Sequence, residues 1–172
     1  MTFSDPEIED FLARNFACAK ASLDPGLFLG SASRHSEELL AQFPEGAGGG
    51  NVRCIFCTQD GRIVSEVKGF WRPPRFREEA DLALRMASAS KEAIQAMHVE
   101  RAAALDAERA GVERERAALT EPEPKPSPWA RRIAALNRMA RSHRESREVL
   151  LVPVEEHLRR VEDEVWTKGK VG

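Results

Sequence analysis

Two cysteines, Cys54 and Cys57, stand in the stretch NVRCIFCTQDGRIV with the C-x-x-C spacing that redox enzymes and zinc sites both use. A reactive redox pair sits at a helix N-terminus, where backbone amides and the helix dipole lower the thiol pKa. Here the flanking residues predict a β-strand, in which successive side chains point to opposite faces. Residues three apart then lie on opposite faces, too far for a disulfide. We therefore expect two small apolar strand residues, with one exposed reactive thiol as the alternative.

Metal and phosphate sites have less support in the sequence. A zinc knuckle would need a second pair of ligands, and Cys18 with His35 or His98 offers none at a recognisable spacing. The segment GAGGG precedes a strand and lacks the Lys-Ser/Thr of a P-loop, so we interpret it as a loop. We expect the histidines to be surface residues or to have satisfied hydrogen bonds, because they lie in helical segments without an i, i+4 metal-type partner: His35, His98, His143 and His157. The sequence thus predicts no catalytic, cofactor-binding or metal-binding residue.

The length and composition of the chain argue against several classes of protein. The chain has 172 residues and a formal net charge of −2, which argues against a dedicated nucleic-acid or membrane-surface protein. Three cysteines are too few for a disulfide framework. The acidic start MTFSDPEIED lacks the features of a signal peptide, and no segment approaches the roughly 20 apolar residues of a membrane span. We expect a soluble, cytoplasmic protein.

The first half of the chain predicts alternating helices and strands. Ser4, followed by an acid and a proline, indicates the start of a helix, with Ser4 as its cap. Residues 16–22 predict a short strand, and Ser33 opens a second predicted helix that ends at Pro44. The runs VRCIFC and RIVSEV, joined by TQDG, predict a β-hairpin, because Asp-Gly is typical of such turns.

The second half predicts helices. In KGFWRPPRF the second proline is placed to open a helix, and residues 75–119 read as one long run of helix formers. Its first half is expected to pack on the core and its second half to extend outward. A proline-rich linker follows, then a basic amphipathic helix starting at PWARRIAAL, and after a break at Pro153 a last helix and a frayed end, TKGKVG.

The basic helix and the helix before it carry complementary charges. We expect the basic helix to fold back across the linker and pair with the acidic residues, within one chain or between chains. Nucleic-acid binding is the alternative, although no aromatic residues alternate with the arginines. The arginines are Arg131, Arg132, Arg138, Arg141, Arg144 and Arg147, and the acids are Glu100, Asp106, Glu108, Glu113, Glu115 and Glu121.

The order of these elements resembles bacterial thioredoxin-like domains over residues 2–90. The resemblance rests on FSDPEIEDFLARNFACAKASLD and on CIFCTQDGRIVSEVKGFWRPPRFREEADLAL, in which a D-G hairpin precedes G-F-x-x-P-x-x-F. It implies that residues 16–22 form a parallel strand, which the family's first strand separates from the hairpin. It also implies that the redox C-x-x-C and the first strand of the family lie upstream of Met1, and that Asn51 and Val52 replace the family's cis-proline. Without that first strand, residues 16–22 and the hairpin must pair directly, be bridged by another chain or leave edges exposed.

The resemblance has consequences for function. Cys54 and Cys57 are then not the catalytic cysteines, and the missing first strand leaves edges that invite self-association. A misassigned start codon, with an upstream selenocysteine codon read as a stop, is an alternative. We therefore expect a non-catalytic binding or scaffold module that contacts a protein partner or itself. The rivals are a thiol-disulfide oxidoreductase with upstream cysteines, and a helical protein that binds an anionic partner through Arg131–Arg147.

The sequence as a whole predicts an α/β protein with a partial thioredoxin-like sheet, made of a parallel strand plus a β-hairpin, with flanking helices. A long helix and a helical C-terminal tail follow. The expected organisation is a thioredoxin-like domain at 1–90, a helical extension at 91–119, a proline-rich linker at 120–128 and a basic helical tail at 129–172.

Overall fold

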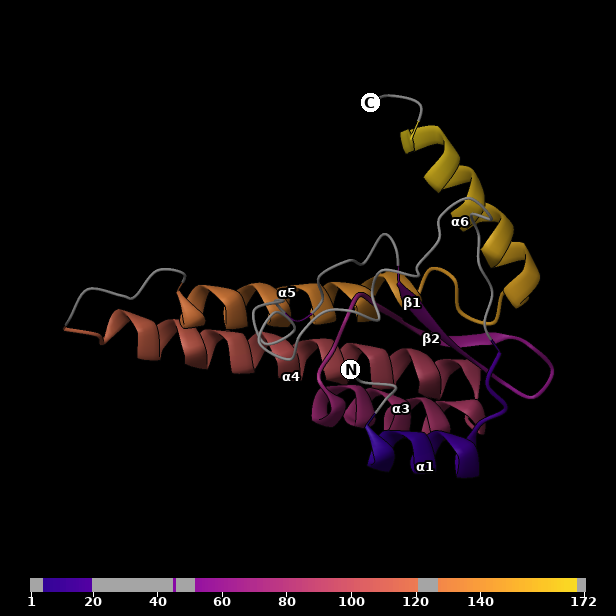
Figure 1. The fold of residues 1–172 in the computed structure, drawn as a ribbon, viewed down its shortest axis with the longest axis horizontal. Helices are drawn as coiled ribbons and strands as arrows, with labels where there is room; N and C mark the ends of the chain where they lie inside the picture. Colours follow the sequence, from indigo (N-terminus) through magenta and orange to yellow (C-terminus); the bar gives the residue numbers. More distant parts are fainter. Residues whose placement is uncertain (1–4, 20–44, 46–51, 121–126, 170–172) are drawn as a thin grey trace.

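The chain forms a mixed α/β structure in which helices surround a small antiparallel sheet (Figure 1). The computed structural model describes residues 5–19, 45, 52–120 and 127–169, and their side chains as far as Glu162. The predicted helix at Ser33–Phe43 and the residue His35 therefore lie outside the described residues. The elements are α1 (Pro6–Asn15), β1 (Arg53–Cys57), β2 (Ile63–Lys68), α3 (Pro73–Ala87), α4 (Lys91–Ala117), α5 (Pro128–Ser146) and α6 (Val154–Gly169).

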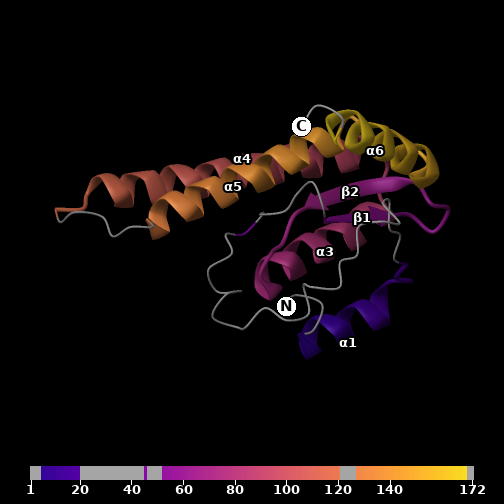
Figure 2. The ribbon, with the colours of Figure 1, turned by 45° about the horizontal axis from the view of Figure 1, so that its top comes forward.

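The elements are arranged in layers. The sheet lies between the α4–α5 pair on one side and α3 with α1 on the other (Figure 2). Each layer contributes to one hydrophobic core, with Val67 from β2, Met86 from α3, Leu105 from α4 and Met139 from α5 all almost completely buried. The core therefore runs across residue 90, where the sequence predicted a boundary between a domain and a helical extension. Among the described residues, no helix is long and apolar enough to cross a membrane.

The predicted β-hairpin is confirmed, and its pairing is irregular at one place. Phe56 lies opposite Ser65, whereas Cys57 lies opposite Ile63, so Val64 is an extra residue on β2. Such a bulge takes one residue out of the regular ladder. The turn between the strands ends at Gly61, which adopts φ = 76° and donates its N–H to the Thr58 carbonyl at 3.0 Å.

The predicted parallel strand at residues 16–22 is not present as a strand in its described part. Phe16–Ala19 follow α1 without joining the sheet, and the remaining residues lie outside the described ranges. The two strands that are described pair antiparallel. Phe16 nevertheless packs on the sheet, with its ring 5.6 Å from that of Phe56 between centroids. Apolar contact therefore holds this segment against β1, although its described residues form no strand.

Three predicted helix boundaries need correction. The cap of α1 is Asp5 and not Ser4, because Asp5 Oδ1 accepts from the backbone N–H groups of Glu7 and Ile8. Helix α3 begins at Pro73, the first proline of the pair and not the second. The expected single helix over 75–119 is two helices, because Ser90 accepts the N–H of Ala93 and caps a new one.

The α4–α5 pair is an antiparallel helical hairpin, so the prediction that the basic helix folds back is confirmed. Arg132 pairs with Glu108 at 3.3 Å and Arg144 pairs with Asp106. The seam between the helices repeats every seven residues, the spacing of a coiled coil. Its members are His98, Leu105 and Val112 on α4, and Leu136 and His143 on α5, all of them buried.

Helix α6 begins after Pro153, as predicted, and includes Thr167–Gly169, where the sequence predicted a frayed end. The segment before it is tied to the start of β2, because Ile63 N–H donates to Val152 O at 3.0 Å and Leu151 N–H donates to Ile63 O at 2.8 Å. Leu151 adopts φ = 61°, a left-handed conformation that is uncommon for a residue other than glycine. The link between α5 and α6 is thus fixed by backbone hydrogen bonds to the start of β2.

Candidate functional site

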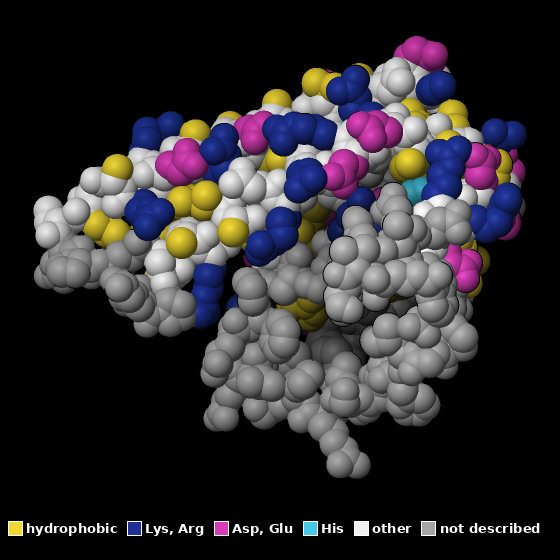
Figure 3. All heavy atoms as spheres, turned by 90° about the horizontal axis from the view of Figure 1, so that it is seen from above, with side chains coloured by type: hydrophobic (Ala, Val, Ile, Leu, Met, Phe, Trp, Pro, Cys, Tyr) yellow, Lys and Arg dark blue, Asp and Glu magenta, His cyan; other side chains and the backbone are white. Residues whose placement is uncertain are grey.

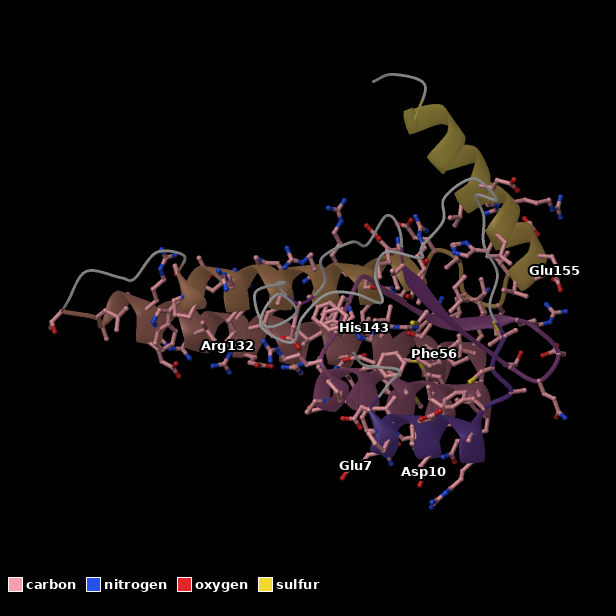
Figure 4. All side chains as sticks on the ribbon, in the orientation of Figure 1. Glu7, Asp10, Phe56, Arg132, His143 and Glu155 are labelled. Atoms are coloured by element: carbon pink, nitrogen blue, oxygen red, sulfur yellow. The ribbon has the colours of Figure 1, made fainter. Side chains whose placement is uncertain are left out.

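A chain of buried polar groups joins β2, α3, α4 and α5, and its member His143 on α5 is labelled in Figure 4. His98 Nε2 lies 2.8 Å from the Val64 carbonyl oxygen, and His98 Nδ1 lies 2.9 Å from His143 Nδ1. His143 Nε2 lies 2.8 Å from Glu79 Oε2. The three side chains are at most 1 % exposed. We call His98 and His143 together the histidine layer.

Backbone and seam geometry explain why these groups meet. The bulge at Val64 takes its carbonyl out of the regular β1–β2 ladder, and His98 satisfies that carbonyl. His98 and His143 occupy equivalent positions in the seven-residue repeats of α4 and α5, so the antiparallel hairpin brings them face to face. A polar residue in such a seam fixes which residues of the two helices oppose each other.

The hydrogen bonds determine where the protons lie. A carbonyl oxygen only accepts, so His98 Nε2 carries a hydrogen. Burial lowers the pKa of His98 to about 4, so the ring is neutral at pH 7 and its Nδ1 is an acceptor. His143 Nδ1 must then donate to His98. When His143 Nε2 also donates to the Glu79 carboxylate, the layer holds one neutral ring and one imidazolium.

Glu79 is ionised although it is 1 % exposed. Burial by itself would raise its pKa, but the hydrogen bond and charge of His143, together with Arg101, outweigh burial and lower it. Arg101 donates to Glu79 Oε1 from Nε at 2.9 Å and from Nη2 at 2.6 Å. The carboxylate therefore has cations on both of its oxygens, which is what a buried charge requires.

A second buried carboxylate, Glu66 on β2, lies next to this chain. Its side chain contacts Arg53 at 3.2 Å and Lys68 at 3.6 Å, and His157 Nε2 of α6 lies 3.6 Å away. The Glu66 backbone bonds to α5, since its N–H donates to Ser146 Oγ and its carbonyl accepts from Ser142 Oγ. These contacts hold α5 and α6 against β2.

The two cysteines of the C-x-x-C motif have thiol pKa values above the ordinary value. Cys18, Cys54 and Cys57 are free, and the last two are partly buried. Burial, with a smaller contribution from Cys18, raises the pKa of Cys54 to about 11. Burial and the nearby Glu155 raise the pKa of Cys57. A reactive thiol needs the opposite shift, because the thiolate is the nucleophile.

The buried chain can hold a proton and fix helices, but it cannot reach a substrate. Within the described ranges, no group of three or more His, Cys, Asp and Glu residues is placed to hold a metal ion. A small cavity of about 120 Å³ lies beside Trp71, Leu136 and Met139. Its arginines, Arg75 and Arg132, both bond to Glu108, so their charge is largely used within the protein.

The structure brings together two of the residues that the sequence singled out, His98 and His143, and adds two that it did not. His98 and His143 are buried with satisfied hydrogen bonds, which is one of the two environments expected for the histidines. His157 is buried and neither of its ring nitrogens has a hydrogen-bond partner among the described residues, so the expectation of a surface or satisfied residue is wrong for it. Glu79 and Arg101 were missed because a charged residue in a helix usually faces solvent. The seven-residue spacing from His98 to Leu105 and Val112 is the signal that could have indicated buried histidines.

No protein-family model, curated protein or solved structure matches this chain.

Proposed function

We propose that the chain is a non-catalytic thioredoxin-like binding module, and that the outer part of the α4–α5 hairpin contacts a protein partner. The observation that carries the proposal is the shape of the hairpin, which extends well past the sheet and past α3 (Figures 1 and 2). We define the arm as residues 109–117 of α4 and 128–134 of α5. A two-helix projection offers surface on several sides, as helical recognition elements do.

The surface of the hairpin fits a protein partner. Basic, acidic and hydrophobic side chains are interspersed along it (Figure 3). The arm contains five arginines and two glutamates, and Arg114, Glu115 and Arg116 are exposed. Near its end, Leu119 is 42 % exposed. Interfaces that form and dissociate have such mixed surfaces, and arginine is enriched in them.

The absence of catalysis is supported by the thiols. Cys54, with a pKa near 11, is almost entirely protonated at neutral pH, and Cys57 is shifted in the same direction. The histidine layer is buried, so it cannot act as a base on a bound substrate.

Site-specific photo-crosslinking tests the arm. A photoreactive phenylalanine analogue replaces Glu115 on the arm in one variant and Glu9 on α1 in a control, both exposed helical glutamates. In the cells that produce the protein, we expect discrete protein adducts from position 115 and few from position 9. An adduct with a second copy of the chain would also support the proposal. Equal labelling from both positions would contradict it.

The rival function is a thiol-disulfide oxidoreductase whose catalytic cysteines lie upstream of this chain. An insulin-reduction assay separates the two functions. We expect no turnover from this chain, because raised pKa values keep the thiols of Cys54 and Cys57 protonated. Turnover that disappears when Cys54 and Cys57 are replaced by serine would overturn the non-catalytic assignment.

A further inference from the structure

The strongest unexplained feature of the molecule is the face-to-face contact of two buried histidines. We propose that the histidine layer is an acid-sensitive latch: one further proton on His98 breaks its bond to His143 and opens the α4–α5 hairpin at this layer. This inference concerns the stability of the hairpin and is independent of what the arm binds.

The geometry of the histidine layer fits one N–H hydrogen on His98 and two on His143. It does not fit a second hydrogen on His98. His98 has one donor, used on the Val64 carbonyl, and one acceptor, used on His143. A proton taken from solvent by His98 Nδ1 would leave two N–H groups pointing at each other across 2.9 Å. The bond between the rings is then lost, and two imidazolium ions face each other in a buried site.

The charged groups around His98 determine the direction of the effect. His143 of α5 and Arg147, which caps that helix, disfavour a proton on the ring, whereas Glu79 of α3 favours one. On its own helix, Arg101 already neutralises Glu79 at 2.6 Å, which weakens that attraction. The strand β2 contributes the Val64 carbonyl, which favours the protonated ring as well. Desolvation is the largest contribution, and it opposes the proton.

The sign of the pH dependence follows. The pKa of His98 is lowered from 6.5 to about 4 in the closed layer, mainly by burial. In an open, hydrated layer the ring regains a pKa of about 6.5. The open form therefore binds the proton more tightly, and falling pH favours opening from about pH 6.5 down to about pH 4. Protonation of Glu79, whose pKa is also lowered on balance, acts in the same direction.

The size of the effect follows from the same linkage. Within that window the equilibrium constant for opening rises by about tenfold per pH unit, or about a hundredfold between pH 7 and pH 4. The contacts of α5 with Glu66 do not contain His98, and they are expected to hold α5 against β2 while the layer opens.

Amide hydrogen exchange on the full chain, corrected for the intrinsic pH dependence, measures the opening. Between pH 7 and pH 4 we expect protection to fall about a hundredfold in α4 around His98, and much less in α3. The carboxamide of His98→Gln has both a donor and an acceptor but takes up no proton between pH 7 and pH 4, so most of the fall should vanish. His157→Gln, a buried histidine outside the layer, should behave like the wild type.

Two outcomes would overturn the latch. One is an equal loss of protection in α3 and α4, which would indicate global unfolding. The other is the same pH dependence in wild type and His98→Gln. Imidazole nitrogen NMR on the wild type gives a test that needs no variant. At pH 7 we expect His98 to carry hydrogen on Nε2 alone and His143 on both nitrogens, and a doubly protonated His98 would refute the proposal.

Discussion

Glu79 of α3 is a buried carboxylate that connects two cationic side chains. Its carboxylate is 1 % exposed and binds His143 on one oxygen and Arg101 on the other. Replacing one member of such a group leaves the others as uncompensated buried charges, which costs far more than the net contribution of the group. The neighbouring Glu78 also binds Arg101, but its side chain is 53 % exposed. The two glutamates thus offer a matched comparison of a buried and an exposed ion pair.

The buried and the exposed glutamate are expected to differ in how much they stabilise the fold. We expect Glu79→Ala to reduce the free energy of unfolding by about 3–5 kcal/mol, because it leaves His143 and Arg101 without their buried anion. Glu78→Ala should cost less than about 1 kcal/mol, since solvent screens the exposed pair. Urea unfolding at pH 7 measures both. Similar losses for the two variants would mean that Glu79 is less buried in solution than in this structure.

Turns and helix interiors determine the shape of the elements. Gly61 ends the turn of the β-hairpin with φ = 76°, a conformation that costs other residues about 1–2 kcal/mol. A Cβ at Gly61 would meet Val154 Cγ1 at 3.9 Å, an ordinary contact, so the cost there is one of backbone conformation. Gly111 lies inside α4, where glycine lowers helix stability relative to alanine.

Replacing these two glycines by alanine is expected to change the free energy of unfolding in opposite directions. Gly61→Ala should lower the free energy of unfolding by about 1–2 kcal/mol. Gly111→Ala should raise it by about 0.5–1 kcal/mol, because alanine loses less backbone entropy in a helix and its Cβ meets only Arg114 Nη2 at 3.9 Å. Thermal unfolding followed by circular dichroism checks both. A stabilising Gly61→Ala would show that the turn has a different conformation in solution.

The hydrophobic core of the molecule contains residues from both sides of residue 90, where the sequence predicted a domain boundary. Met86 of α3 and Ile94 of α4, on either side of that boundary, are both buried in one cluster with residues of β2 and α5. A two-stranded sheet is marginal by itself and needs such packing. Helices α4 and α5 therefore share one hydrophobic core with the elements before residue 90.

A fragment ending at residue 90 tests whether the helices after that residue are needed for a folded core. We expect it to show no cooperative thermal transition, because it would expose the faces of β2 and α3 that α4 and α5 cover and would leave Glu79 without Arg101 and His143. The full chain is the control, and near-ultraviolet circular dichroism reports its packing. A cooperative transition in the fragment would restore an independent domain at 1–90.

The sequence by itself determined the elements whose signals are local. The Asp-Gly turn indicated the hairpin, prolines marked the starts of α3 and α6, and charge patterns indicated that α5 folds back on α4. Propensity alone could not place the break at Ser88–Ser90, because a serine forms a cap only when the chain turns there.

Only the tertiary structure decided what the histidines do. His98 and His143 are 45 residues apart, and His143 and Glu79 are 64 apart. Their protonation depends on burial and on each other, and neither is a property of local sequence. The C-x-x-C motif, by contrast, was visible at once, and packing raised the pKa of both of its thiols. Local residue patterns determine the helices and strands of this chain. Hydrogen bonding and desolvation depend on residues that are distant in the sequence, so only the tertiary structure determines the protonation of these side chains.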